Sequence, residues 1–93
     1  MFYEKTQKAI ERSAERFAKG KASKEDDLLM LLSDGEWHYG REMTEKVSWR
    51  FGGYLFNLKQ DGVAWEKERM RVKGACVYRY RLSQVDEPSA DAL

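Results

Sequence analysis

Residues 48–62 read S-W-R-F-G-G-Y-L-F-N-L-K-Q-D-G, and this stretch decides how the chain folds. Phe51, Leu55 and Leu58 recur at the i, i+4, i+7 spacing of an amphipathic helix, and the final D-G is a typical helix stop. Two adjacent glycines nevertheless lie inside the predicted helix, where each costs roughly 0.5–1 kcal/mol relative to alanine. The sequence therefore predicts a short helix whose outer face is not explained by core packing.

A second short helix directly precedes this one. Residues 40–47 place Met43 and Val47 one turn apart and facing inward, and Ser48 is suited to cap the next helix. Two short helices joined by a tight turn form a helix-turn-helix unit. Before them, E-W-H-Y at 36–39 is long enough only for a brief strand.

The sequence S-K-E-D at 23–26 begins another helix. Ser23 and Asp26 have the spacing of a capping box, in which each side chain bonds the other residue's backbone amide. The neighbouring acids fall in the first turn, where the helix dipole favours negative charge, so capping explains them more simply than a metal site does. The run L-L-M-L-L at 28–32 predicts a helix buried on more than one side, and S-D-G at 33–35 ends it.

A first helix is expected over residues 3–19, with Gly20 suited to end it. Its apolar positions fall on one narrow face, which consists of Tyr3, Ile10, Ala14 and Phe17. Two interpretations are open: the helix packs on its own domain, or this face packs on a second chain.

After Gly62 the apolar period changes from 3.6 to 2, which predicts two β-strands. In the first strand, the side chains that point to one side are Val63, Trp65, Lys67 and Arg69. The second places on one side Cys76, Tyr78, Tyr80 and Leu82, and on the other Arg79 and Arg81. Between the strands Gly74 is able to adopt a positive φ, so the segment predicts a β-hairpin with a basic tip.

The net charge of the 93-residue chain is only +1, but its distribution is uneven. Residues 36–82 contain ten bases and six acids, whereas residues 83–93 contain three acids and no base. Between Lys67 and Arg81, six bases accompany a single acid, Glu68. A protein that is nearly neutral overall can therefore present a local basic strip to a polyanion.

Helix, brief strand, helix-turn-helix and two-stranded hairpin is the element order of the winged helix-turn-helix DNA-binding domains. The sequence resembles the small bacterial and phage members of that family, of the transcriptional-regulator type. The matching segments are D-G-E-W-H-Y-G-R-E-M at 34–43, R-F-G at 50–52, L-K-Q-D-G at 58–62 and Y-R-L at 80–82. Their joint order and spacing carry the resemblance, because each motif alone occurs often by chance.

The resemblance implies an α+β fold with a three-helix core and a C-terminal β-hairpin wing. It covers about residues 25–82, so the first helix and the acidic tail lie outside it, and the chain is expected to have three parts. Residues 1–22 form an extra N-terminal helix, a possible dimerisation element, and residues 23–83 form the winged helix-turn-helix domain. Residues 84–93, which are acidic and contain the only proline, are expected to be a disordered tail.

The resemblance also implies that residues 49–60 form a recognition helix in the DNA major groove and that the turn at 70–74 is a wing on the phosphate backbone. The side chains are compatible with these roles, since Arg grips guanine, and Asn or Gln pairs with adenine. The expected base-contacting residues are Trp49, Arg50, Gly53, Asn57 and Gln60. The expected phosphate-contacting residues are Tyr39, Arg41, Ser48, Arg69, Arg71 and Lys73.

The glycines and aromatics of this helix leave alternatives open. Gly52 is expected to lie toward the preceding helix, where it lets two backbones approach. Gly53 is expected to face outward, either so that the helix sits deep in a groove or as a neutral surface residue. Three alternatives are open for Trp49 and Phe56. They are expected to contact thymine methyls or sugars, to form a protein interface, or to be buried by the N-terminal helix.

The sequence gives little support for catalysis, a metal or a cofactor. His38, the only histidine, is expected to be a surface residue beside the short strand, and Cys76 a small core residue. No ligand set converges with metal-binding spacing, and no glycine-rich phosphate loop is present. No small-molecule ligand is evident.

A cytoplasmic location without a membrane partner is expected. No apolar run approaches 18 residues, and the N-terminus lacks the apolar segment of a secretory signal. The single cysteine cannot form an internal disulfide, which makes a reducing cytosol the default.

These observations lead to one expected function and two alternatives. The chain is expected to bind double-stranded DNA sequence-specifically as a small transcriptional regulator. Because one module buries modest surface, it is expected to bind two half-sites as a homodimer through its N-terminal helix. The alternatives are a winged-helix protein-docking module without DNA binding, and an RNA, replication or recombination role for the same basic face.

Overall fold

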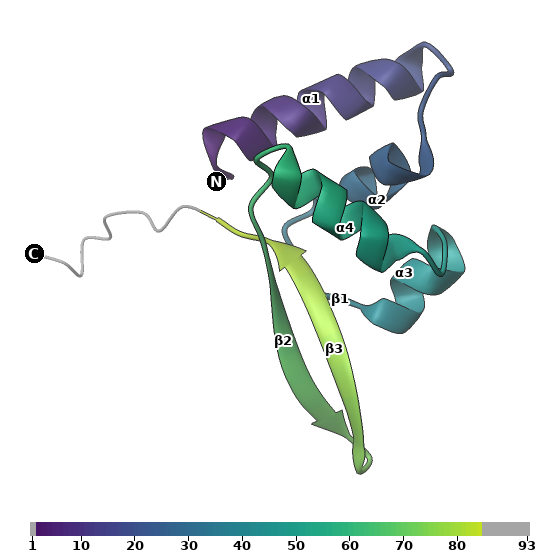
Figure 1. Cartoon of the computed structure of the whole chain (residues 1–93), viewed down its shortest axis with the longest axis vertical. Helices are drawn as coiled ribbons and strands as arrows, with labels where there is room; N and C mark the ends of the chain where they lie inside the picture. Colours follow the sequence, from purple (N-terminus) through teal and green to yellow (C-terminus); the bar gives the residue numbers. More distant parts are fainter. Residues whose placement is uncertain (1, 85–93) are drawn as a thin grey trace, which may run out of the picture.

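Seven secondary-structure elements make up residues 2–84, which are the part of the chain that the computed structural model describes (Figure 1). In chain order they are α1 (Glu4–Ala18), α2 (Lys24–Leu32), β1 (His38–Tyr39), α3 (Gly40–Lys46), α4 (Phe51–Gln60), β2 (Trp65–Val72) and β3 (Ala75–Leu82). The α+β class is confirmed. Apart from Gln84, the acidic tail expected over residues 84–93 lies outside the described residues.

The helices pack together at one end of the hairpin, which projects away from them (Figure 1). Three leucines of α2 have at most 1% of their surface exposed, which confirms that this helix is buried on more than one side. Around them the core contains Met43, Leu55, Leu58, Val63 and Leu82. Each fully buried side chain of this size contributes about 1.5–3 kcal/mol. Within residues 2–84 none of the helices has the length and apolar character to cross a bilayer.

The sheet is antiparallel, with the strand order β1-β3-β2. The strands β2 and β3 pair along their whole lengths and are joined by a two-residue turn, Lys73 and Gly74. The turn expected over residues 70–74 is therefore too long, because residues 70–72 are paired within β2. Both turn residues have positive φ, 50° and 83°, as a type I′ hairpin turn requires, so the expected conformation of Gly74 is confirmed. The short strand β1 pairs with only two residues of β3, Arg79 and Tyr80.

Helix α1 packs on its own domain, but not through the apolar face expected from the sequence. Its buried side chains are small: Thr6, Ala9 and Ser13. Their size lets α1 lie close to α2, and the Thr6 hydroxyl accepts a hydrogen bond from the backbone amide of Ala64 at 3.0 Å. In the expected face, Ile10 is partly buried against the core and the remaining members are exposed: Tyr3, Ala14 and Phe17.

A buried carboxylate ties α1 to α2. Asp26, 3% exposed, accepts hydrogen bonds from the Ser13 hydroxyl at 2.7 Å and from the Arg16 guanidinium at 2.7 and 2.9 Å. It also completes the expected capping box with Ser23. The bond from Arg16, only partly opposed by burial, holds the pKa of Asp26 well below its usual range. One side chain therefore caps α2 and positions α1.

Asp26→Ala is expected to lower the free energy of unfolding by about 2–4 kcal/mol, because it removes the reciprocal half of the capping box and leaves the Ser13 hydroxyl and the Arg16 guanidinium without their acceptor. Asp27→Ala is the matched control. The Asp27 carboxylate is more exposed and lies 4.0 Å from Lys24 Nζ, so its loss is expected to cost less than about 1 kcal/mol. Urea unfolding followed by circular dichroism measures both, and equal losses would contradict the role given to Asp26.

Candidate nucleic-acid interface

The turn between α3 and α4 places Trp49 and Arg50 before the helix rather than inside it. Helix α4 begins at Phe51, and no side chain caps its N-terminus. The Ser48 hydroxyl instead accepts a hydrogen bond from the Arg50 amide at 3.1 Å, and the Ser48 carbonyl accepts one from the Phe51 amide at 3.1 Å. These two bonds hold a turn. The helix predicted over 49–60 is therefore two residues too long at its start, and Ser48 does not cap it.

The outer face of α4, opposite its buried leucines, is exposed and consists of Gly53, Phe56, Asn57 and Gln60. The outward position of Gly53 is thus confirmed. Gly52 is exposed as well, and a Cβ built on either glycine would meet no atom within 4 Å. The expectation that Gly52 packs against the preceding helix is wrong, because that flank of α4 is open. The glycines leave the N-terminal half of α4 without side chains over two consecutive positions.

Two aromatic side chains stand free in this region. Trp49 is 73% exposed and Phe56 is 60% exposed. Burial by the N-terminal helix, one of the three interpretations above, is therefore excluded. The Arg50 guanidinium lies 5.1 Å from the centroid of the Trp49 ring, within the range of a cation–π contact. Trp49 and Phe56 are available to a ligand or to another protein.

An acidic side chain from α2 borders the other half of α4. The side-chain amide of Asn57 donates a hydrogen bond to the Glu25 carboxylate at 2.6 Å. This carboxylate occupies the donor that Asn57 would offer to a base, and it repels a polyanion. The N-terminal half of α4 has no such neighbour among these contacts and carries the positive end of the helix dipole. The two halves of the helix therefore differ in their suitability for DNA.

One face of the hairpin carries basic side chains that have no acidic partner in the part of the chain that the structure describes. Directly opposite residues of antiparallel strands point to the same face, so the pairing of β2 with β3 groups Lys67, Arg69 and Arg71 with Cys76 and Tyr78. We call these five residues the basic face. Lys67 Nζ lies 5.2 Å from the Tyr78 ring centroid, and Arg69 Nη2 lies 3.1 Å from Cys76 Sγ. Within residues 2–84 none of its three bases forms an ion pair.

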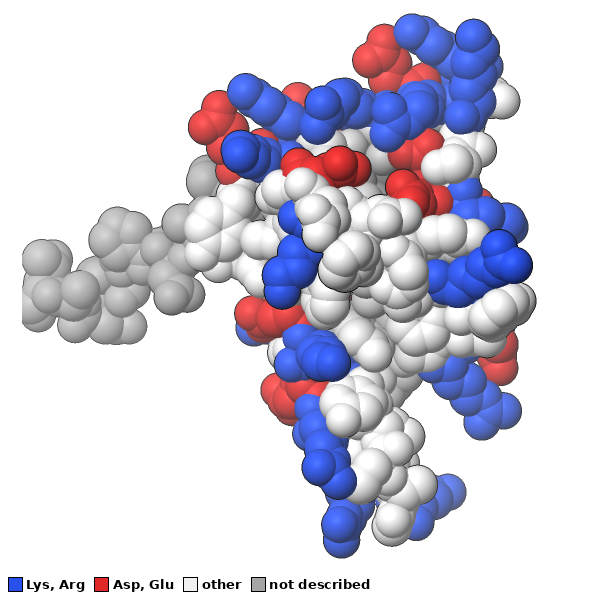
Figure 2. All heavy atoms as spheres, in the orientation of Figure 1, with Lys and Arg blue, Asp and Glu red and all other residues white. Residues whose placement is uncertain are grey.

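The basic face lies on the side of the sheet that packs on α4. At the base of the hairpin this side carries Trp65, whose indole donates a hydrogen bond to the Leu55 carbonyl of α4 at 2.8 Å. It also carries Tyr80, which packs edge-to-face on Phe51 with ring centroids 5.6 Å apart. In Figure 2, blue side chains continue down the hairpin below the helices. The basic face and the outer face of α4 therefore adjoin.

The predicted phosphate contacts left out two lysines of this surface. Lys67 alternates with Arg69 and Arg71 along β2, and this spacing was the signal for it. Lys59 lies on α4, with its ammonium 5.2 Å from the Trp65 ring centroid, so it links the helix to the hairpin. Nothing in the sequence indicates that contact, because it depends on the packing of the hairpin against α4.

The opposite face of the hairpin neutralises its own charge. Arg79 pairs with Glu68 at 2.8 Å, and Arg81 pairs with Glu66. The two guanidinium groups also lie 4.5 and 4.4 Å from the ring centroid of Trp37. These two arginines are therefore occupied by intramolecular partners, unlike the three bases of the basic face and Lys73 in the turn.

The structure does not bring Tyr39 and Arg41 onto the basic face. They lie at the start of α3, across a groove of about 650 Å³ from the outer half of β3. Tyr39 is paired with Arg79 in the sheet, and therefore shares the face opposite to the basic one. Arg41 is exposed and bonds Glu45 at 3.3 Å.

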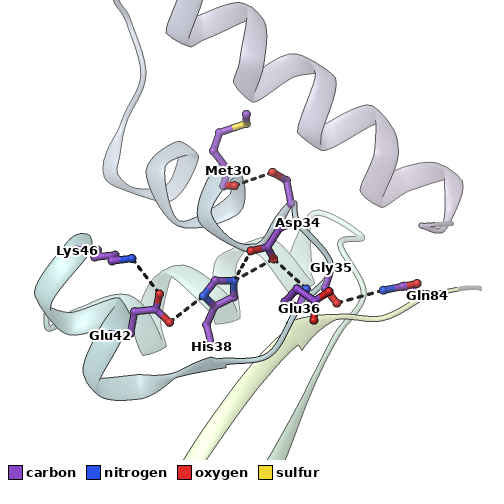
Figure 3. Close-up of polar contacts among 9 residues, drawn as sticks. Met30, Asp34, Gly35, Glu36, His38, Glu42, Lys46 and Gln84 are labelled. Atoms are coloured by element: carbon purple, nitrogen blue, oxygen red, sulfur yellow. Dashed lines mark hydrogen bonds and ion pairs between the residues drawn. The ribbon is translucent and has the colours of Figure 1, made fainter.

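His38, expected at the surface, is buried where β1 meets α3 (Figure 3). Its Nδ1 lies 2.8 Å from a Glu42 oxygen, and its Nε2 lies 2.9 and 3.0 Å from the two oxygens of Asp34. Carboxylates only accept hydrogen bonds, so this arrangement fits an imidazolium with a proton on both nitrogens. Burial lowers the pKa of His38, but the hydrogen bonds to the two carboxylates outweigh it and raise the pKa overall. The bridge fixes the start of α3 against the loop before β1.

Cys76, expected in the core, is exposed. The hairpin extends beyond the helices, so only its base, around Trp65 and Leu82, packs against them. Among the described residues, no group of three or more His, Cys, Asp or Glu side chains is arranged to hold a metal ion.

Comparisons with protein-family models, with curated proteins and with solved structures find no significant match for the chain.

The free energy of unfolding is expected to fall as the pH rises above 6.5, the ordinary pKa of histidine. Because the pKa of folded His38 is raised, protonation stabilises the fold fully below pH 6.5, and this contribution is lost as the pH passes through the raised value. Urea unfolding at a series of pH values measures the effect, and His38→Gln should flatten the curve. The imidazole proton resonances report the pKa without ambiguity, because the chain has one histidine. A pKa at or below 6.5 would contradict the bridge.

Proposed function

We propose that the chain is a winged helix-turn-helix protein that binds double-stranded DNA, with α4 in the major groove and the β2–β3 turn on the phosphate backbone. The observation that carries this proposal is the basic face, whose bases form no ion pair with any acid of residues 2–84 and which adjoins the exposed side of α4. We further propose that the protein acts as a small, sequence-specific transcriptional regulator.

Electrostatics supports the phosphate contacts. Each cation that neutralises a phosphate releases condensed counterions, and this release supplies much of the affinity for DNA. The available bases near the proposed groove are Arg50, Lys59, Lys67, Arg69, Arg71 and Lys73. We assign the backbone contacts chiefly to the hairpin bases. Ser48, Tyr39 and Arg41 would add contacts from the helix-turn-helix side.

The base contacts are proposed for the N-terminal half of α4. Arg50 precedes the helix and is suited to grip guanine, while the bare surface at Gly53 lets the backbone approach the base edges. Trp49 and Phe56 would contact thymine methyls or sugars. Asn57 and Gln60 belong to the other half, and Asn57 can read a base only after it exchanges its bond to Glu25. Discrimination should therefore be strongest at the base pairs that face Arg50.

A homodimer is part of the proposal, since two half-sites give tighter binding than one module, and α1 is one candidate surface for contact with the second copy. Tyr3 and Phe17, 46% and 42% exposed, are the large apolar side chains that α1 offers to a second copy.

Exposure of Trp49 and Phe56 favours a second candidate function, a protein-docking module in which these two residues are the anchors. An electrophoretic mobility shift with random duplex DNA at low salt discriminates the two functions. Retardation at micromolar protein supports DNA binding, and its absence supports docking.

Arg71→Ala is expected to weaken duplex binding and to reduce the slope of log K against log salt concentration by about one unit, because one phosphate contact is lost. Lys21→Ala removes the same charge from the α1–α2 connection, far from the wing in Figure 1, and should leave the slope unchanged. Fluorescence anisotropy with a labelled duplex measures both. An equal loss in the two variants would show that only net charge matters.

Gly53→Ala is expected to stabilise α4 by roughly 0.5–1 kcal/mol, since the added methyl meets no neighbour, and yet to weaken DNA binding. Gly52→Ala is the matched control, with the same gain in helix propensity on the flank of α4. Thermal unfolding and anisotropy titrations report the two quantities. Unchanged or tighter binding by Gly53→Ala would rule out close approach of the backbone to DNA.

A further inference from the structure

The two edges of the sheet are protected to different degrees. The outer edge belongs to β2, in which five of the six residues from Glu66 to Arg71 are charged. The other edge belongs to β3, and β1 covers it only at Arg79 and Tyr80. Within residues 2–84, the segment 75–78 therefore has no strand partner on that side, and its sequence, A-C-V-Y, contains neither a charge nor a proline. Proteins usually block exposed edges with such residues, and here only one edge is blocked.

Open space lies beside the unprotected edge. The groove of about 650 Å³ runs between Cys76, Val77 and Tyr78 of β3 and the start of α3, where its lining includes Tyr39, Gly40 and the charged residues Arg41, Glu42 and Glu45. A paired strand needs a separation of about 4.8 Å, and its side chains project above and below the sheet. The groove therefore leaves room for an added strand along the segment 75–78.

We propose that this edge is a contact between two copies of the chain, which pair their β3 strands antiparallel about a two-fold axis perpendicular to the sheet. A second copy fits because the segment is self-complementary, with small and apolar residues on both sides of the axis. An isologous contact of this kind uses the same patch twice and closes on a dimer. The sheet would become six-stranded. The unpaired backbone groups along segment 75–78 of each copy would then be hydrogen-bonded to the other copy.

The register of this pairing is fixed by two constraints. Because the two-fold axis is perpendicular to the sheet, each face of one copy continues into the same face of the other. Directly opposite residues point to the same face, so the numbers of two paired residues must differ by an even number. Residue 79 is already paired with β1. The longest pairing that respects both constraints joins Gly74 with Tyr78, Ala75 with Val77, and Cys76 with its own copy.

The dimer also places both basic faces on one side of the enlarged sheet, because the axis is perpendicular to it. This consequence for DNA rests on the proposed function, whereas the strand pairing itself does not. Failure of DNA binding would leave the pairing intact, and a monomer that binds DNA would overturn the pairing alone.

Disulfide trapping tests the register. Opposite residues have Cα atoms about 4.5–5.5 Å apart, inside the 4.4–6.8 Å range of disulfides, so diamide should convert the wild-type chain to a Cys76-linked dimer. Cys76→Ser with Tyr78→Cys is the matched control. Its two cysteines would lie four residues apart along the strands, about 13 Å, and should cross-link at least tenfold more slowly. Equal rates for the two proteins would contradict the register.

Sedimentation equilibrium under reducing conditions tests the surface. Val77→Lys is expected to raise the dimer dissociation constant by about tenfold or more, because it places a charge against apolar residues at the edge. Phe17→Lys makes the same change of charge on α1 and should leave the constant unchanged, and circular dichroism verifies the fold of both variants. A monomeric wild-type chain, or a dimer lost only in Phe17→Lys, would overturn the proposal, and the latter would assign the contact to α1.

Discussion

The hydrogen bond from the Trp65 indole to the Leu55 carbonyl marks the junction on which the rest of the structure depends. Together with the edge-to-face contact of Tyr80 and Phe51, it holds the base of the hairpin against α4. A two-stranded hairpin is marginally stable by itself and has no preferred direction relative to a helix. This junction supplies the direction, and it places the basic face beside the exposed side of α4. The proposed contacts of the hairpin bases with the DNA backbone depend on that placement.

Strand register then determines which bases of the hairpin are available. Arg79 and Arg81 lie opposite Glu68 and Glu66 and stack on Trp37, so their charges are satisfied within the protein. The bases on the other face of β2 lie opposite tyrosines and a cysteine, which offer no counter-charge. A shift of one residue would exchange the faces of one strand and mix these two groups. The register thus converts a nearly neutral chain into one with a cationic surface.

The same dependence on neighbours explains which site residues the sequence could predict. The basic positions of β2 were predictable because a period of two follows from the backbone of any strand. The hydrogen bond of Asn57 was not predictable, because its partner Glu25 lies 32 positions away in the chain. Likewise, the open surface around Gly52 depends on how α3 and α4 cross, which no local pattern encodes.

By itself the sequence determined the features that depend on residues a few positions apart. The capping box of Ser23 and Asp26 formed as expected, as did the positive φ of Gly74, because each is fixed by local hydrogen bonds and local sterics. Only the tertiary structure decided the burial of His38 between two carboxylates and the exposure of Cys76. Burial depends on which elements meet, and that outcome is set by the packing of the whole core rather than by any one segment.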